Sequence, residues 1–348
     1  MSEPVDSSAY SIAAGSQCHR FSHRAMACIW EVWIAGQAPD YAQDAAQAAF
    51  DEVDRLEEEL SRFVDSGDVA RINRLQTGQS VVVGADTFDC LELAAKVQVD
   101  THGAFDVTVG SSPTAWSTPG APGSRPAALT DRESPIDSRQ SSAMALDRPT
   151  RRVTACVANL RVDLGGIGKG YALDQMIHLL RDWSIEAAIV HSGQSTLYAL
   201  GRAPQQSDWT VGIRNPDEQS SLLGYVRMRD QALAGSGTTL HGEHIVDPRT
   251  GQAAQGATGA WALATSAALA DALSTAFMVM SGAEMDAYFA LHPDVAGLRL
   301  IRDHGEGDRA GASTHSSRTT QSNRAATPEP VGRLVRYGAG SRFVEPMG

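Results

Sequence analysis

The chain has 348 residues, of which 42% are hydrophobic and 20% charged, values that are ordinary for a soluble globular protein. Its formal net charge of −12 argues against nucleic acid as the main partner, because phosphate contacts need clusters of Lys and Arg. The chain has no run of about eighteen apolar residues and no basic start followed by an apolar core, so we expect neither a transmembrane segment nor a signal peptide. Its four cysteines are scattered without a CxxC pair, which favours free thiols and a cytoplasmic location over a disulfide or zinc site.

In chain order, the first feature is a polar stretch, residues 1–22, that is expected to be loose. A strand is predicted at 27–35. Apolar residues at three- and four-residue spacing then predict an amphipathic helix over 41–61, with Asp40 as its N-cap. A second helix is predicted over 87–97.

The remainder of the chain alternates between turn residues and short apolar runs. Pro, Ser and Gly dominate residues 111–139, which predicts a long surface loop. The strands expected after it are 143–146, 152–157, 187–190, 196–200, 209–213, 224–229 and 231–234. Helices are predicted from the glycine-rich stretch to Trp183 and over 269–280, the second being apolar on nearly every face and therefore buried. Residues 304–348 have few apolar anchors and are expected to form a disordered tail, which leaves 23–303 as the folded domain.

The most informative motif is DLGGIGKGYALD, residues 163–174, with four glycines between a strand-like and a helix-like run. Glycines at such a place let the backbone approach a phosphate and point the first N–H groups of a helix at it. The motif is not a Walker A loop, because Gly170 follows Lys169, and it lacks the third glycine of a dinucleotide fingerprint, because Tyr171 stands there. A tight turn without a ligand is the alternative.

A second motif, ADALSTAF at residues 270–277, places the Asp271 carboxylate and the Thr275 hydroxyl one helical turn apart on one face. Both are hard oxygen ligands, which suit Mg²⁺ bound to a pyrophosphate. An unpaired carboxylate inside so apolar a helix is costly, which favours a ligand over a surface acid. With the glycine-rich motif, this indicates an enzyme of phosphate chemistry.

Four further segments carry polar groups in apolar or glycine-marked settings: LSRFVDSGDVARIN (60–73), GAFDVTVG (103–110), HSGQSTLYALG (191–201) and HIVDPRTG (244–251). In order and spacing, these motifs resemble those of the FAD:protein FMN transferase (ApbE) family over about residues 26–301. Each motif alone is weak, but HIVDPRTG followed by ADALSTA, both downstream of DLGGIGKGYA, is specific.

The resemblance implies an α+β fold: a single two-lobed, T-fold-like domain with FAD in the cleft between the lobes. Such enzymes use Mg²⁺ to cleave the FAD pyrophosphate, release AMP and leave FMN on a Thr or Ser hydroxyl of a target protein. Some relatives instead let water attack and hydrolyse FAD to FMN and AMP. By the family pattern, the metal ligands here would be Asp271, Thr275 and the backbone carbonyl of Gly168.

The FAD contacts that the resemblance and the residue chemistry suggest are Met26, Phe63, Ala104, Phe105, Asp106, Gly165, Lys169, Tyr171 and Val246. Asp106 would accept hydrogen bonds from the flavin or adenine, and an Asx turn is its alternative. Tyr171 would stack and offer its hydroxyl to a phosphate or ribose, and plain packing is its alternative. Lys169 would help electrostatically at the pyrophosphate or else be solvated.

HIVDPRTG supplies the candidate proton chemistry. His244 is the candidate base, because an imidazole can take a proton from a hydroxyl near neutral pH. Asp247 would orient His244 or lie near the metal, and it is equally well explained by the type I turn that DPRTG favours. Arg249 could reach a phosphate but is more often a solvated turn residue.

The chain departs from the family pattern at two places. HSGQST, with Ser195 in place of an acid, stands where the family often has an N-x-G-G-D loop, and Met26-Ala27-Cys28 replaces a Met-Gly-Thr start. We expect these changes to affect acceptor choice and flavin affinity rather than the chemistry. The predicted function is therefore a cytoplasmic, Mg²⁺-dependent FAD:protein FMN transferase; an FAD pyrophosphatase and a non-catalytic flavin-binding protein are the alternatives.

Overall fold

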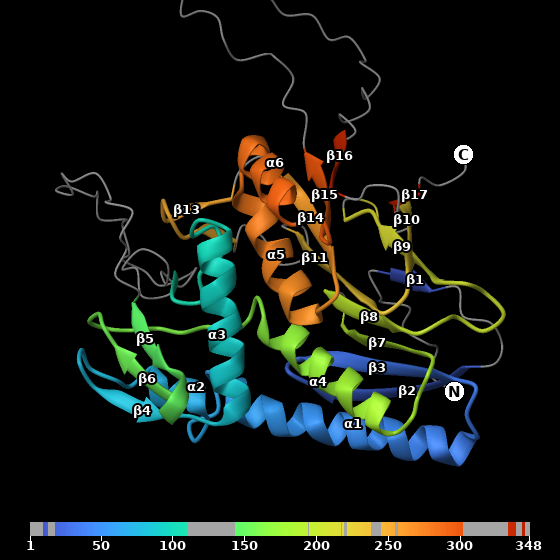
Figure 1. Ribbon diagram of the computed structural model, residues 1–348, viewed down its shortest axis with the longest axis horizontal. Helices are drawn as coiled ribbons and strands as arrows, with labels where there is room; N and C mark the ends of the chain where they lie inside the picture. Colours follow the sequence, from blue (N-terminus) through green and yellow to red (C-terminus); the bar gives the residue numbers. More distant parts are fainter. Residues whose placement is uncertain are drawn as a thin grey trace, which may run out of the picture.

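The computed structural model describes residues 10–12, 18–109, 143–193, 195–216, 218, 221–237, 245–254, 257–301, 333–338 and 343–344. The protein is a mixed α and β structure built on one large sheet (Figure 1), as the α+β prediction requires. The surface loop expected at 111–139 lies outside the described residues. Within the described residues, no helix is long and apolar enough to cross a membrane.

An eight-stranded sheet forms the centre of the molecule, with every neighbouring pair antiparallel. Its strands, in spatial order, are β16 (Arg333–Gly338), β15 (Ala296–Ile301), β14 (Ala257–Ala264), β11 (Gln231–Gly237), β8 (Thr196–Leu200), β7 (Ala188–Ser192), β3 (Cys28–Ala35) and β2 (Cys18–Ala25). The predicted strands at 27–35, 187–190, 196–200 and 231–234 are confirmed as β3, β7, β8 and β11.

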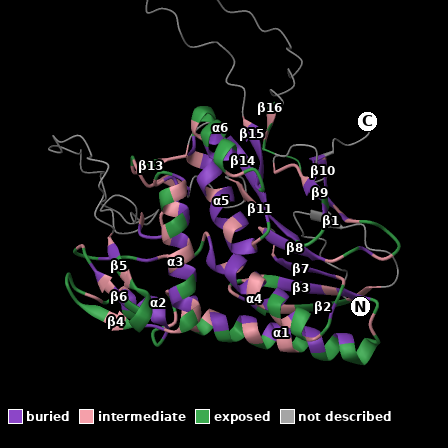
Figure 2. Cartoon of the chain, in the orientation of Figure 1, coloured by how far each residue is buried: buried purple, intermediate pink, exposed green. Residues whose placement is uncertain are grey.

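Helices cover one face of this sheet (Figure 1). They are α1 (Pro39–Leu60), α4 (Gly168–Asp182), α5 (Ala267–Val279) and α6 (Gly282–Leu291). The helix α3 (Ala85–Asp100) lies beside α5, and the short α2 (Asp68–Ile72) lies beside α1. The apolar stripe predicted for α1 is buried, whereas α5 is buried along most of its length (Figure 2). The helices predicted at 41–61, 87–97 and 269–280, and the one ending near Trp183, are all confirmed.

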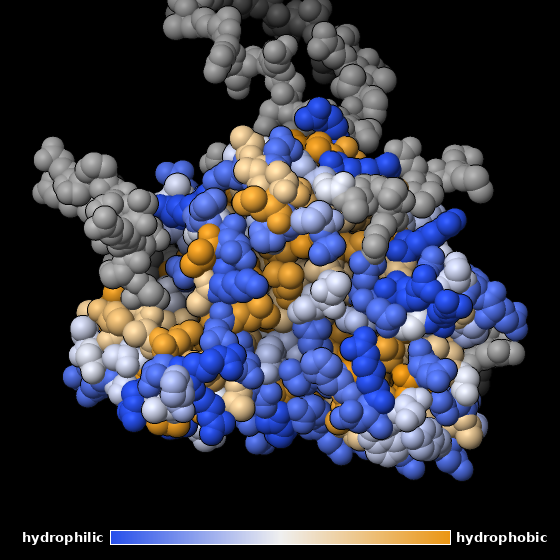
Figure 3. All heavy atoms as spheres, in the orientation of Figure 1, coloured by the Kyte–Doolittle hydropathy of each residue, from blue (hydrophilic) through white to orange (hydrophobic). Residues whose placement is uncertain are grey.

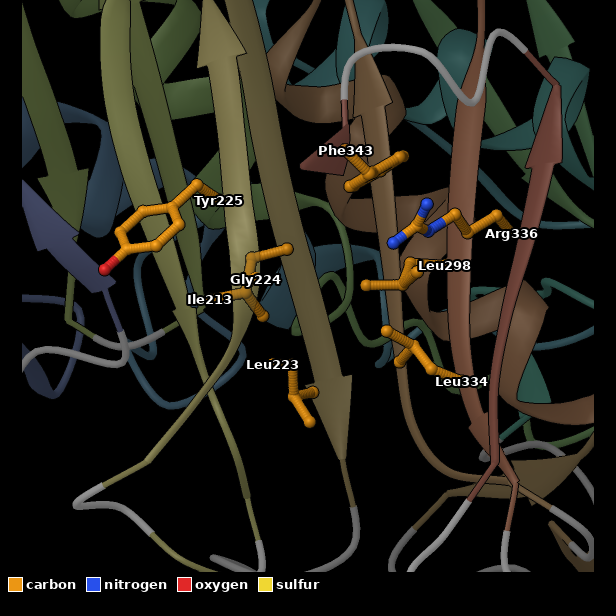
Figure 4. Close-up of a pocket in the computed structure, with 8 residues that line it drawn as sticks. All are labelled: Ile213, Leu223, Gly224, Tyr225, Leu298, Leu334, Arg336 and Phe343. Atoms are coloured by element: carbon orange, nitrogen blue, oxygen red, sulfur yellow. The ribbon is translucent and has the colours of Figure 1, made fainter. Parts of the chain in front are cut away.

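A four-stranded sheet packs on the opposite face. Its order is β1 (Tyr10–Ile12), β9 (Trp209–Arg214), β10 (Leu222–Met228) and β17 (Phe343–Val344). Buried side chains such as Trp209 and Val226 from this layer meet Leu197 and Leu263 of the large sheet. A small hollow between the two layers is lined by Ile213, Leu223, Gly224, Tyr225, Leu298, Leu334, Arg336 and Phe343 (Figure 4), none of which was predicted for the site.

Two smaller sheets complete the structure. One holds β4 (Ser80–Val82), β6 (Arg152–Ala155) and β5 (Met144–Asp147), with the 3-10 turn Arg148–Thr150 joining β5 to β6. The other is the hairpin of β12 (Val246–Asp247) and β13 (Gln252–Ala253).

Three predictions about ends of elements are wrong. Two parts of the stretch 1–22 are not loose, because Tyr10–Ile12 form β1, which pairs with β9, and residues 18–22 form the first part of β2, which pairs along β3. The α1 helix begins at Pro39 after the N-cap Ala38, so Asp40 lies inside the first turn, where its charge favours the helix N-terminus. Two strands lie in the region 304–348, where a disordered tail was expected: β16 pairs with β15, and β17 pairs with β10, while the rest of that region lies outside the described residues.

Candidate active site

The glycine-rich motif forms a turn that leads directly into α4. The N–H groups of Ile167 and Gly168 both donate to the Leu164 carbonyl, at 3.0 and 2.6 Å, and that of Gly165 donates to Asp163 Oδ1 at 2.9 Å. A Cβ on Gly170 would lie 2.3 Å from the Ala267 carbonyl oxygen. Glycine at 170 is therefore what lets the first turn of α4 lie against the first turn of α5.

Asp271 of α5 points at this junction. Its side chain is buried, and its Oδ2 accepts from the Gly170 N–H at 3.1 Å while Oδ1 accepts from the Thr196 hydroxyl at 3.0 Å. Burial raises the pKa of the Asp271 carboxyl, and the charge of Lys169 and these two hydrogen bonds lower it only in part. One donor to each oxygen fixes the carboxylate and leaves each oxygen a further lone pair.

Thr275 brings its hydroxyl to the same place. Its Oγ1 lies 3.4 Å from the Asp271 carbonyl oxygen, 3.3 Å from Ser236 Oγ, and 3.3 Å from the position that a Cβ on Gly166 would take. The Phe105 ring lies equally close to that position, with Cε2 at 3.3 Å. The glycine-rich turn, α5 and the GAFD segment, three motifs far apart in sequence, thus converge.

These oxygen atoms fit Mg²⁺ binding. Asp271 supplies a buried negative charge that a cation would neutralise, Thr275 supplies a neutral oxygen, and Gly168 begins α4 two residues before Gly170. No group of three or more His, Cys, Asp and Glu side chains among the described residues could hold a metal, and the expected set of carboxylate, hydroxyl and carbonyl is not of that type. The metal assignment stays a prediction.

The GAFD segment is buried at Ala104 and Phe105 and ends in a turn at Asp106. Asp106 Oδ1 accepts from both the N–H and the hydroxyl of Thr108, at 2.7 Å each. Asp106 thus makes the Asx-type turn that was its alternative reading, and its second oxygen Oδ2 is not used by those bonds. Contact of these residues with FAD stays a prediction.

Two residues that follow the glycine-rich turn have protein partners. The Tyr171 hydroxyl donates to Asp86 Oδ1 on α3 at 2.9 Å, and burial together with that carboxylate raises the pKa of Tyr171. The Lys169 ammonium donates to the Gly165 carbonyl at 3.1 Å, so its charge stays over the turn. The Tyr171 hydroxyl and the Lys169 ammonium thus both have protein partners next to the glycine-rich turn, and their contact with FAD stays a prediction.

Met26 and Phe63 lie in surface turns. Met26 and Ala27 both have positive φ, at +47° and +59°, as a two-residue turn between antiparallel strands requires. Phe63 is 81% exposed, and the Arg62 guanidinium lies 4.6 Å from its ring centre. Arg62 also pairs with Asp163 at 3.3 Å, which connects Phe63 to the glycine-rich turn.

In the HIVDPRTG motif, His244 lies outside the described residues, and Val246 begins the β12–β13 hairpin. The Asp247 carboxylate accepts both the Nε and Nη2 donors of Arg249, at 2.9 and 2.8 Å. Burial raises the pKa of Asp247, but the Arg249 hydrogen bonds outweigh it and hold that pKa below the usual value. A turn is present where DPRTG predicts one: the Thr250 N–H donates to the Asp247 carbonyl at 3.2 Å, as in a β-turn, and the Gly251 N–H donates to the same carbonyl at 2.8 Å.

The two departures from the family pattern are neighbours in space. The Gly193 N–H donates to the Ile29 carbonyl at 2.7 Å, and a Cβ on Gly193 would lie 3.1 Å from Cys28 Cβ. The Ser195 carbonyl accepts from the Gly235 N–H at 2.7 Å, and the next residue, Thr196, is the one bound to Asp271. The divergent β2–β3 and β7–β8 turns therefore lie next to each other beside the candidate metal ligand.

Sequence reasoning missed three residues of this site. Thr196 and Ser236 bind Asp271 and Thr275, as described above. Asp174 accepts from the N–H groups of Ala267 and Ala268, at 2.7 and 3.0 Å, and from the Ser266 hydroxyl, so it caps α5. Thr196 and Asp174 are within the quoted motifs, but nothing in the sequence shows which helix or carboxylate they contact; Ser236 carries no signal.

The sequence model described as the ApbE family matches residues 26–298. The chain is 28% identical over 284 residues to the FAD:protein FMN transferase of Treponema pallidum (strain Nichols), covering 74% of this chain and 77% of that protein. It is 26% identical over 246 residues to that of Klebsiella pneumoniae (strain 342), covering 66% and 69% respectively.

Solved structures agree with the fold. The flavin transferase ApbE from Vibrio cholerae superposes with a TM-score of 0.71 at 20% identity, covering 94% of this chain and all of that one. The ApbE protein from Thermotoga maritima gives a TM-score of 0.67 at 25% identity, covering 82% and 94%. These coverages show that the likeness extends over most of the chain rather than over a single motif.

Proposed function

This chain belongs to the ApbE family, and from that premise we propose that it is a Mg²⁺-dependent transferase that moves FMN from FAD to a Thr or Ser hydroxyl of a protein. The observation that carries the proposal is the convergence of the Asp271 carboxylate and the Thr275 hydroxyl on the glycine-rich turn. A buried carboxylate with open lone pairs at a helix N-terminus is costly unless it has a positively charged partner.

The chain's own groups suit a bound pyrophosphate. Gly165, Gly166 and Gly168 carry no side chain at the turn before α4, which lets a phosphate approach the backbone, and Lys169 keeps its ammonium over that turn. When bound, Mg²⁺ would neutralise charge on the pyrophosphate oxygens, with Asp271, Thr275 and the Gly168 carbonyl as its protein ligands.

The flavin end of FAD needs an apolar surface. Hydrophobic atoms reach the surface at the centre of the face shown in Figure 3, over α5 and beside α3. Phe105 lies at the glycine-rich turn and Phe63 at the surface beyond Arg62. Such surfaces suit the flat faces of an isoalloxazine ring, for which we propose Met26, Phe63, Ala104, Phe105, Asp106, Gly165, Tyr171 and Val246 as neighbours.

We propose His244 as the group that takes the proton from the acceptor hydroxyl. The freed oxygen then forms a bond to the phosphorus of the FMN half, while the bond from that phosphorus to the bridging oxygen breaks. AMP leaves with the bridging oxygen and its electron pair, and FMN stays on the acceptor as a phosphoester. Water in place of the protein hydroxyl would give FMN and AMP by the same steps.

The test is AMP release from FAD by purified protein, with and without Mg²⁺, and with and without an acceptor lysate. AMP that requires Mg²⁺ and rises as a flavin-fluorescent protein band forms supports the transferase. AMP with free FMN and no labelled band supports the hydrolase. Tight FAD binding without AMP under any condition contradicts both and leaves a flavin-binding protein.

The compartment that we propose is the cytoplasm. All four cysteines are free thiols, and Cys156 is exposed to solvent. Free thiols persist in a reducing compartment, where disulfides are rare. Detection of the native protein in the soluble fraction after selective release of periplasmic contents checks this assignment, and its release with that fraction contradicts it.

A further inference from the structure

Arg249 joins parts of the molecule that are far apart in sequence. Its Nε and Nη2 donate to Asp247 in its own turn, its Nη1 donates to Glu284 of α6 at 2.5 Å, and its Nη2 also donates to the Val279 carbonyl at the end of α5, at 3.3 Å. A Cβ on Gly103, at the start of the GAFD segment, would lie 3.6 Å from Arg249 Cγ. The side chain is only 25% exposed, so it is not the solvated turn residue that the sequence suggested.

Both acidic partners are themselves fixed. Glu284 uses its other oxygen to accept the Ser281 N–H at 2.7 Å in the capping box of α6. Asp247 also accepts the Arg249 backbone N–H at 2.9 Å. The two carboxylates raise the pKa of Arg249, and the hydrogen bonds from Arg249 help to hold the pKa values of Asp247 and Glu284 below their usual range.

Arginine is the side chain that this arrangement needs. A planar guanidinium can donate two parallel bonds to Asp247 and still direct a third group at Glu284 and a helix carbonyl. A cation at the end of α5 is also favoured by the helix dipole, and α5 has no basic residue in its own last turn. A lysine would keep the charge but could not make all these contacts at once.

We propose that Arg249 is a positioning residue that locks the HIVDPRTG turn to α5, the helix that carries Asp271 and Thr275. This inference rests on the proposed function. It gives the two most specific motifs of the chain, HIVDPRTG and ADALSTA, a direct physical connection. It also assigns the Asp247 carboxylate to holding Arg249, so that Asp247 acts on the reaction through the position of the turn and not by carrying a proton.

The test compares Arg249→Met and Arg249→Lys with Arg148→Met. Arg148 is a matched control, because its guanidinium also makes two bonds to a carboxylate, that of Glu92, but it is exposed and lies outside the site. Misplacing a catalytic turn by about 1 Å costs about 100-fold in rate, so we expect that loss of kcat for Arg249→Met and about tenfold for Arg249→Lys. Arg148→Met should match the wild type.

Three further readouts distinguish a positioning role from a general loss of stability. The FAD dissociation constant, measured by flavin fluorescence, should change much less than kcat. Guanidinium ions added to Arg249→Met should restore part of the rate. Amide hydrogen exchange should become faster at residues 245–254 in Arg249→Met and stay unchanged in β7 and β8. A global rise in exchange with a lowered melting temperature would mean a structural role only and would overturn the proposal.

Wild-type rates by Arg249→Lys and Arg249→Met, with unchanged exchange at 245–254, would also overturn it. If the wild type releases no AMP, the proposed function fails, but the exchange measurement still decides whether Arg249 locks the turn. If the wild type releases AMP and the Arg249 variants release it at the same rate, the inference fails and the proposed function stands.

Discussion

The two sides of the candidate site differ in how closely their sequence motifs match those of the ApbE family. On the α4–α5 side, the motifs match the family pattern, and the polar groups are fixed by contacts between elements: Gly170 to Asp271 and Asp174 to the start of α5. On the β2–β3 and β7–β8 side, the sequence departs from that pattern, yet the two departing turns still pack on each other through Gly193 and Cys28. Under the proposed function, the α4–α5 side would carry the chemistry, and the departing turns would act in recognition of the flavin or the acceptor. Thr196 is where the two sides meet.

The largest effect is expected at the chemical centre. Asp271→Asn removes the buried negative charge with little change in shape, so kcat for AMP release should fall about 1,000-fold, equivalent to about 4 kcal/mol of transition-state stabilisation. Binding of Mn²⁺, measured by electron paramagnetic resonance, should weaken in parallel. Normal AMP release by a folded Asp271→Asn protein would show that the α4–α5 side is not the chemical centre.

The next effect concerns the junction of α4 and α5. Gly170→Ala puts a methyl group against the Ala267 backbone, which cannot yield, so the free energy of unfolding should fall by about 3 kcal/mol. Gly282→Ala is the control, because no atom lies within 4 Å of that position, and its stability should be unchanged or slightly higher. Urea unfolding of both variants measures the difference, and equal midpoints would contradict the close contact.

A smaller effect is expected where the two sides meet. Thr196→Val keeps the shape of the side chain but removes the hydroxyl that donates to Asp271 Oδ1. Losing one group that orients a metal ligand should weaken Mg²⁺ binding about tenfold. The Mg²⁺ concentration for half-maximal AMP release and the Mn²⁺ affinity should shift together. If neither changes, Thr196 does not connect the departing turns to the chemistry.

The smallest effect is a pH dependence on the recognition side. Glu31 of β3 is buried, which alone would raise its pKa, but donors from His191, Arg20 and Trp33 bring that pKa from 4.5 down to about 2. Because the folded pKa is the lower one, the stabilisation is present above pH 4.5 and is lost as the pH falls towards 2. The unfolding free energies of wild type and Glu31→Gln should therefore converge as the pH falls over that interval. A difference that is constant with pH would contradict the charged cluster.

The sequence predicted amphipathic helices better than fully buried strands. Periodicity located α1, since one face of that helix is buried and the other solvated. It did not reveal β14, which lies inside the sheet with every residue buried, so that ATGAWALA shows no alternation. The strands β15 and β16 and the helix α6 were also missed.

The motifs located Asp271, Thr275 and the glycine-rich turn, but they could not show that Tyr171 contacts Asp86 or that Asp247 contacts Arg249.

Helix α5 shows the division most clearly. The sequence by itself determined that it is helical and buried and that Asp271 and Thr275 share a face, because these follow from local composition and helical spacing. Its first turn has no acid and its last turn no base of its own. The tertiary structure supplies both, with Asp174 of α4 at its N-terminal N–H groups and Arg249 and Arg299 at the carbonyls of Val279 and Met280. Charges that complement a helix dipole act through space, so only the packed fold could decide which residues provide them.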